Sequence, residues 1–316
     1  MNKCIIALLL AVFIFSSCST PPKDKKEQEL PGIKNQAAEY TATGNNFFNQ
    51  AQYNQALEYY RLALRENISI DNEEGIVKSY NDLGKVFAVQ RDLDVALEYF
   101  NDAYALAQRL ERPELLAQSE INIGEVYLRK GSSKEALEQF QSALSRPIDG
   151  LDEEKKAILY HNLGQAYKNQ NDLTQAETYI KQALEINQKL NNQHEIAGNY
   201  YALASVYSLR QQYDQAAEYA RTALETDKKV ENSKGIAKDL YALGIINEKA
   251  GNTKEAYDYY YKAYRVNITL NLRAEVIKTL QHLIETSKQL DLEEERTEYE
   301  EILEQLTEPA ESTENN

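Results

Sequence analysis

The side chains that most often do chemistry in enzymes are few in this chain, and they are scattered along it. The three histidines have no neighbouring ligand cluster and stand far apart, at positions 161, 194 and 282. His194 and Glu195 do not open an HExxH zinc motif, because Gly198 stands where the second histidine is needed. No glycine-rich phosphate-binding pattern is present. We therefore expect no catalytic residues, no metal ion, no cofactor and no enzymatic activity.

The two cysteines lie near the N-terminus, in a segment typical of a targeting signal. Residues 5–15 are eleven apolar residues in a row, preceded by Lys3. A membrane-spanning helix needs about twenty, so this run fits the apolar core of a signal peptide better. It ends in Phe15-Ser16-Ser17-Cys18, which resembles the lipobox of bacterial lipoproteins, whose cysteine is acylated and becomes the first residue. The alternative is an ordinary secretory signal followed by an incidental cysteine.

The lipobox resemblance implies a place in the cell. Residues 1–17 would be removed, and Cys18 would carry acyl chains sufficient for stable membrane attachment. Ser19 is similar to the residue of outer-membrane lipoproteins rather than to the aspartate that retains others, so the resemblance implies an outer-membrane anchor facing the periplasm. Residues 18–33 contain three prolines among charged residues, and this composition predicts an extended, flexible tether.

The composition excludes two classes of partner. Fifty Asp and Glu residues outnumber 35 Lys and Arg residues, which gives a formal net charge of −15. A nucleic-acid-binding protein needs a basic face, and a polybasic membrane-surface protein needs clustered cations. With only 12 Gly and 6 Pro in 316 residues, and abundant Ala, Leu, Glu and Lys, the chain is expected to be mostly helical.

Small residues recur at a fixed spacing of forty residues. They are Gly44, Gly84, Gly124, Gly164, Ala204 and Gly244. Each is followed after twelve residues by an alanine, at positions 56, 96, 136, 176, 216 and 256, and after seven more by another, at 63, 103, 143, 183, 223 and 263. Six repeats without an insertion indicate one structural unit used six times.

The apolar residues around these positions predict two helices in each unit. In the second unit Tyr80, Leu83 and Phe87 fall on one stripe of a first helix at about 100° per residue. After a polar break, Ala96 and Phe100 share one face of a second helix. Small residues at the crossing let the two helices approach to about 8–10 Å.

These residues resemble the signature of the tetratricopeptide repeat. Its tryptophan, Leu-Gly, tyrosine, alanine and aromatic positions correspond here to Tyr80, Leu83-Gly84, Phe87, Ala96 and Phe100. The resemblance spans six units over residues 34–272 and implies an all-α, right-handed solenoid of stacked helix-turn-helix units. The proline that closes the usual 34-residue unit is missing, as in longer-repeat members such as kinesin light chains and bacterial peptide-sensing regulators.

Departures from the repeat predict local differences. Pro147 should cut the second helix of the third unit short, and Asn247 replaces the aromatic residue of the sixth. Residues 273–306 keep a helical period but lack the small residues, so we expect a helix pair that caps the stack. Residues 307–316 have no periodic apolar residues and are expected to be disordered.

In this family, peptides usually lie along a concave surface made by the first helices. Positions three before, one after and four after the small residue turn away from the packing stripe and would face such a ligand. The candidate binding residues on this surface are Asn81, Lys85, His161, Lys168, Tyr201 and Tyr241. The two tyrosines are the expected anchors, and the basic residues are expected donors to a partner's carboxylates or backbone. The alternative is an ordinary half-exposed surface.

Together these patterns predict a membrane-anchored scaffold of the bacterial cell envelope that binds a protein or peptide partner. One alternative is an accessory subunit of a periplasmic transport or envelope-assembly complex, which retention of a small ligand would favour. Another is a peptide-sensing regulator, against which the lipobox counts. No nucleic-acid partner is expected, and a small-molecule ligand is not favoured by the scaffold interpretation.

Overall fold

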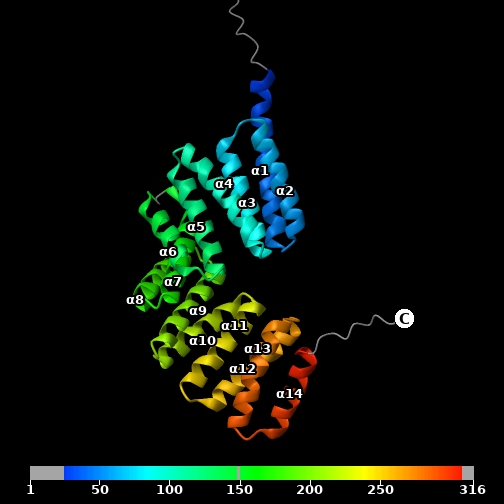
Figure 1. Ribbon diagram of the computed structural model, residues 1–316, viewed down its shortest axis with the longest axis vertical. Coiled ribbons are helices and arrows are strands. Elements are labelled where there is room, and N and C mark those ends of the chain that lie inside the picture. Colours follow the sequence, from blue (N-terminus) through cyan, green and yellow to red (C-terminus); the bar gives the residue numbers. More distant parts are fainter. Residues whose placement is uncertain (1–24, 148–149, 308–316) are drawn as a thin grey trace, which may run out of the picture. The chain divides into compact units, whose positions relative to one another are not determined.

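The computed structural model describes residues 25–147 and 150–307, and this part of the chain holds fourteen α-helices and no strand (Figure 1). The helices are α1 (Lys25–Asn49), α2 (Tyr53–Ser69), α3 (Glu73–Val89), α4 (Leu93–Arg109), α5 (Pro113–Arg129), α6 (Ser133–Ser145), α7 (Glu153–Asn169), α8 (Leu173–Lys189), α9 (Gln193–Leu209), α10 (Tyr213–Lys229), α11 (Ser233–Lys249), α12 (Thr253–Thr269), α13 (Arg273–Gln289) and α14 (Glu293–Thr307). Odd-numbered helices are the first helices of the repeated pairs, and even-numbered helices are the second.

The chain divides into two compact units, one containing α1 and α2 and the other containing α3 to α14. In the first unit Gly44 of α1 lies against the ring of Tyr60 of α2, whose hydroxyl donates a hydrogen bond to Oδ1 of Asn45 at 2.7 Å. In the second unit each helix packs on the next along the chain, so that successive helix pairs form the predicted solenoid.

The N-terminal helix corrects one prediction. The tether expected to reach residue 33 is helical from Lys25, and α1 continues through Pro31. The residues before this proline are Lys, Glu, Gln and Leu, all strong helix formers. The predicted signal peptide, Cys18 and residues 308–316 of the tail lie outside the described residues.

Three-residue turns of nearly constant geometry join most successive helices. In the turn after α3, Arg91 has a φ of 67°, and the N–H of Asp92 donates to the carbonyl of Phe87 at 2.9 Å. This is the Schellman arrangement, which satisfies the last carbonyls of a helix. A turn residue with positive φ recurs every twenty residues, but among the described turns only Gly131 and Gly251 are glycine. The backbone therefore repeats every twenty residues, while the side-chain pattern repeats every forty.

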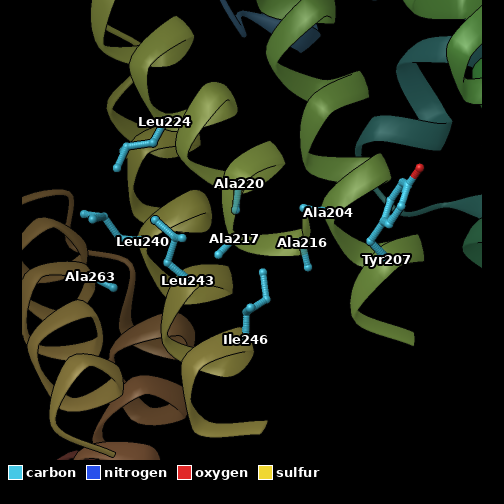
Figure 2. Packing of buried hydrophobic residues seen from close by; sticks show 10 residues of the cluster. All are labelled: Ala204, Tyr207, Ala216, Ala217, Ala220, Leu224, Leu240, Leu243, Ile246 and Ala263. Carbon is cyan, nitrogen blue, oxygen red and sulfur yellow. The ribbon is translucent and has the colours of Figure 1, made fainter. Parts of the chain in front are cut away.

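The small residues lie where the two helices of each pair cross. All twelve alanines of the repeat pattern are completely buried. A Cβ added at Gly84 would lie only 2.7 Å from Cδ1 of Phe100, so the ring occupies the space that a side chain would need. In α9 the small residue is Ala204, and the second helix provides Ala220 in place of a ring (Figure 2). The size of one residue is thus matched to the size of the other.

An aromatic sandwich completes most pairs. In the pair α3/α4 the ring of Tyr99 lies between those of Tyr80 and Phe87, with centroid distances of 6.1 and 5.4 Å. The same arrangement recurs in α1/α2, α7/α8 and α9/α10. These rings explain much of the high tyrosine content, because they pack the repeat itself.

The third pair replaces the sandwich with an ion pair between a buried glutamate and a partly exposed arginine. Glu120 of α5 stands in register with Tyr80 and is 1% exposed. It accepts hydrogen bonds from Nε and Nη2 of Arg146 at 2.7 and 2.6 Å and from Ser142 at 2.8 Å. Arg146 is available because α6 ends at Ser145, which confirms the shortening predicted from Pro147.

The helix pair predicted after the last repeat is present as α13 and α14. Tyr299 of α14 is 4% exposed and packs in the cluster that contains Tyr260, Leu280 and Leu283. Its hydroxyl lies 3.0 Å from that of Tyr257. This pair covers the apolar side of α12 with residues that the small-residue pattern does not include.

The length and hydropathy of the helices show whether one of them could span a membrane. Within residues 25–147 and 150–307, no helix is both long enough and apolar enough to cross a bilayer.

Candidate partner-binding face

The first helices of the second compact unit contact one another through polar side chains. Nδ2 of Asn162 of α7 donates to Oε1 of Glu125 of α5 at 2.9 Å, and Nδ1 of His161 lies 2.7 Å from Oδ1 of Asn199 of α9. We call the surface made by α3, α5, α7, α9, α11 and α13 the first-helix face. All six predicted groove residues belong to these helices.

One predicted contact residue is not available to a partner. Asn81 is 4% exposed, and its amide donates to the carbonyl of Val77 at 3.1 Å and to Oγ of Ser119 at 3.2 Å. Its Oδ1 accepts a hydrogen bond from Nδ2 of Asn122 at 2.7 Å. The prediction for Asn81 is therefore wrong, because a short amide at this position fits between α3 and α5 and is fully engaged there.

The next predicted residue, Lys85, remains accessible at one end of the face. Its side chain is 44% exposed, and its ammonium group lies 3.6 Å from Oδ1 of Asp82. Burial raises the pKa of Asp82, although the positive charge of Lys85 opposes that shift. The positive charge of Lys155 of α7 lowers the same pKa, so a charge two repeat units away acts on this carboxyl group of α3.

His161 and Lys168 lie together further along the face. Burial lowers the pKa of His161, although the hydrogen bond to Asn199 opposes this, so the imidazole is neutral near pH 7. Partial desolvation also lowers the pKa of Lys168, and the charge of Lys238 lowers it further. Lys168 belongs to α7 and Lys238 to α11, which means that side chains from either side of α9 converge here.

The two predicted tyrosine anchors are each covered by a lysine from the following first helix. Nζ of Lys238 lies 3.9 Å from the ring centroid of Tyr201, and Nζ of Lys278 lies 4.5 Å from that of Tyr241. Each lysine follows its tyrosine by 37 residues, so the two pairs are one arrangement repeated. Partial burial raises the pKa of Tyr201, and it raises that of Tyr241 to about 12. Both rings are therefore neutral phenols that hold an ammonium group against one face.

Lys238 and Lys278 were not among the predicted site residues. They stand six positions before the small-residue position of α11 and α13, about 120° around the helix. That direction adjoins those of the three positions used for the prediction. The position six before the small residue therefore also belongs to this side of the helix, and it is a lysine in α3 as well, at Lys78.

A second cluster of aromatic and charged groups closes the C-terminal part of the face. Oε2 of Glu248 accepts a hydrogen bond from the hydroxyl of Tyr260 at 2.5 Å and lies 3.0 Å from Nδ1 of His282. The imidazole stacks on the ring of Tyr260 with a centroid distance of 4.7 Å and meets Tyr241 edge-on at 5.5 Å. Tyr241 is therefore packed against Tyr260 and His282, which fix the position of its ring.

Two buried carboxyl groups lie beside the face, at the junction of α10 and α11. Asp227 is 4% exposed and Asp239 is 2% exposed. Burial raises the pKa of Asp239 to about 8, and the neighbouring Asp227 contributes to that shift. Asp227 accepts a hydrogen bond from Nδ2 of Asn232 at 2.9 Å, and Asp239 holds a proton near pH 7. No group of three or more potential metal ligands is found among the described residues.

A family model agrees with this architecture. The model described as tetratricopeptide repeat matches residues 75–149, 115–189, 155–229 and 195–268. The matched segments overlap and together cover more than half of the chain. A search of curated protein sequences found no match to this chain.

Several solved structures have a similar fold. The apo form of the quorum sensor NprR from B. thuringiensis is 18% identical, with a TM-score of 0.67 over 89% of this chain and 82% of that one. A Rap protein complexed with competence and sporulation factor is 19% identical, with a TM-score of 0.62 over 89% and 79% of the two chains. Pseudomonas aeruginosa PilF is 17% identical, with a TM-score of 0.53 over 74% and 93%. At these identities the likeness concerns the fold alone.

Proposed function

Since the chain belongs to the tetratricopeptide repeat family, a fold suited to protein–protein interaction, we propose that it is a binding scaffold whose first-helix face holds an extended segment of a partner protein. The observation that carries this proposal is the repeated lysine–tyrosine pair of α9/α11 and α11/α13. Each pair offers an aromatic surface and an ammonium group side by side.

The chemistry of these pairs suits a peptide backbone with occasional carboxylates. Among the described residues, no carboxylate oxygen lies within 4.0 Å of Nζ of Lys238 or Lys278, so their donors are available. Tyr201 and Tyr241 are rigid and only partly exposed, and they give contact area at small entropic cost. His161 and Lys168 extend the same surface towards the N-terminal side.

We also propose that the scaffold is attached to a membrane of the bacterial envelope, most simply the outer membrane, through lipid on Cys18. The support is the apolar run at residues 5–15 that ends in Phe15-Ser16-Ser17-Cys18. Cys18→Ser should then release the protein from the membrane fraction and abolish labelling by radioactive palmitate. Labelling that persists in this variant would remove the anchor.

The binding proposal is tested by in-cell crosslinking and pulldown of the native protein beside a Tyr201→Ala/Tyr241→Ala variant. The native form should capture a partner that the double variant loses, while both show the same circular dichroism. Tyr261→Ala is the matched control, because this tyrosine is 40% exposed on α12 and belongs to a second helix. Capture of the same proteins by native and double-variant forms would place binding on another face.

A peptide sensor is a second candidate, favoured by the likeness to a quorum sensor and to a Rap protein in complex with a factor. In that case the ligand would be a free peptide. Isothermal titration with peptides fractionated from culture medium distinguishes the two, because a scaffold for a folded partner should show no saturable heat. Binding by such a peptide that survives in the Tyr201→Ala/Tyr241→Ala variant would exclude the first-helix face for both candidates.

A further inference from the structure

A second surface, lined mainly by second helices, has the properties of a separate binding site. A groove of about 830 Å³ lies between α10 and α12, and we call it the α10–α12 groove. Its floor is apolar and includes Leu224 and Leu240, which are 6% and 8% exposed, and the half-buried Val266 and Leu270. The groove shares no residue with the first-helix contacts described above.

The groove exists because one ring of the repeat is missing. In the preceding pair Tyr200 lies 6.2 Å from the ring of Tyr219 of α10, and its hydroxyl accepts a hydrogen bond from Gln188 of α8 at 3.3 Å. That ring therefore fills the space between α8 and α10. Leu240 stands in register with Tyr200 and is too short to reach across, so the space between α10 and α12 stays open. Tyr259, in register with Tyr219, consequently has part of its ring on the groove.

Cations surround this apolar floor. Arg221 and Lys228 of α10 and Lys262 and Arg265 of α12 are exposed and line the groove. Glu225 is the one carboxylate among the lining residues, and Lys228 pairs with it at 2.8 Å. Within the described residues, no carboxylate lies within 4.0 Å of the other three cations. A strongly positive groove therefore stands on a chain with a net charge of −15.

The preceding unit does not carry these cations at the corresponding positions. Forty residues earlier, the positions of the four cations are occupied by Lys181, Gln188, Thr222 and Glu225. Only one of those four is positive, and one is negative. The repeat pattern does not require the cations, and they coincide with the pair in which the ring is absent.

We propose that the α10–α12 groove binds an acidic amphipathic helix of a partner protein. Its apolar side chains would enter the groove onto Leu224 and Leu240, and its carboxylates would meet Arg221, Lys262 and Arg265. The α12 wall runs from Tyr259 to Leu270, about 17 Å at 1.5 Å per residue, which matches three turns of a helix.

The arrangement of apolar and charged groups favours a helix over a lipid surface. The leucines lie at the bottom of the groove and the exposed arginines at its rim, so an occupant must project apolar groups inward between the cations. A helix ridge does this, whereas a flat layer of anionic headgroups would meet the rim alone. This site is independent of the proposed function of the first-helix face.

The test is a selection of random 14-residue peptides displayed on phage, against the native chain, with counter-selection against Leu240→Tyr. This substitution restores the ring found in the preceding pair and should close the groove without unfolding the protein. Enriched peptides should be acidic, with apolar residues at positions i, i+3, i+4 and i+7. Enrichment of basic sequences, or of none, would overturn the proposal.

Charge reversal provides a second variant that does not depend on the core. Arg221→Glu/Arg265→Glu should weaken the selected peptide at least tenfold by fluorescence anisotropy, and raised salt should weaken native binding in the same direction. Lys249→Glu/Lys254→Glu is the matched control, because both lysines are exposed and lie outside the groove. Equal affinity in the two double variants would refute the proposed site. Cosedimentation with phosphatidylglycerol vesicles that only Arg221→Glu/Arg265→Glu abolishes, without peptide binding, would assign the groove to a membrane instead.

Discussion

Gly124→Ala tests whether the ring that faces Gly124 is what keeps this position small. A Cβ at Gly124 in α5 would lie 2.8 Å from both Cδ1 and Cζ of Phe140, and closer still to Cε1. Phe140 is completely buried in the cluster that also contains Leu159 and Leu163, so its ring cannot move without disturbing that packing. We therefore expect the substitution to destabilise the protein, although alanine favours a helix over glycine by about 1 kcal/mol.

The magnitude follows from two opposing effects. Overpacking a buried site costs about 1–3 kcal/mol, and the gain in helix propensity is about 1 kcal/mol. Gly124→Ala alone should therefore cost up to about 2 kcal/mol, and Phe140→Ala alone about 3–5 kcal/mol. Once the ring has been removed, the new methyl group meets empty space, and Gly124→Ala should stabilise by about 1 kcal/mol. The two substitutions are thus coupled by about 1–3 kcal/mol.

The assay is urea unfolding followed by far-ultraviolet circular dichroism on the four proteins of this double-mutant cycle. The expected order places the double variant above Phe140→Ala in stability. The chain already contains this combination, since Ala204 and Ala220 are both small in the pair α9/α10. If Gly124→Ala costs the same free energy with and without the ring, the steric explanation of the repeat is refuted.

Three further predictions concern single positions. Gly198→Ala should raise the free energy of unfolding by about 0.5–1 kcal/mol, and with it the urea midpoint, because this helical glycine has nothing within 4 Å of an added Cβ. A lowered midpoint would contradict that. Glu111→Gly should stabilise by up to about 1 kcal/mol in thermal melts, because Glu111 has a φ of 52°, whereas Gly131→Ala should destabilise at its φ of 79°. The pKa of Asp239 is raised from 3.8 to about 8 in the folded protein, so native stability should fall as pH rises from about 4 to 8; Asp239→Asn should flatten this dependence in urea titrations at pH 5 and 8, and unchanged slopes would refute it.

The fold could be predicted from the sequence because two helices that cross closely require a small residue at the crossing. Only a small residue fits opposite Phe100 or Tyr260, and this requirement recurs every forty residues. Pro147 likewise forecast the short α6, since a proline cannot continue a helix interior. The early start of α1 was not predicted, because a proline indicates the end of a helix, whereas the residues around Pro31 favour one.

The candidate site was less predictable, because it depends on contacts between repeats. A helical wheel places Asn81 and Tyr201 in equivalent directions, yet the amide of Asn81 is taken up by Ser119 of the next first helix. In the same way, the lysine over Tyr201 comes from the following repeat. The residue pattern of one repeat unit does not show which side chains of the next unit contact it.

One residue in the sequence marks the α10–α12 groove, although it looks like an ordinary variation of the repeat. Tyrosine stands four residues before the small position in most units, and Leu240 interrupts that series. Glu120 interrupts it too, but there Arg146 packs against the buried glutamate and pairs with it. Two breaks in one pattern thus led to opposite outcomes, which only the packing around each could distinguish.

The succession of helix pairs in the second unit also has a kinetic consequence. Because each helix packs on the next along the chain, the closing steps of folding join segments close in sequence and incur little loop entropy. A pair such as α7/α8 lies within one short stretch of the chain, residues 153–189, and each later pair has a preformed surface on which to assemble. The second unit can therefore fold progressively, one helix pair after another, and exposed apolar surface stays confined to the ends of the folded part.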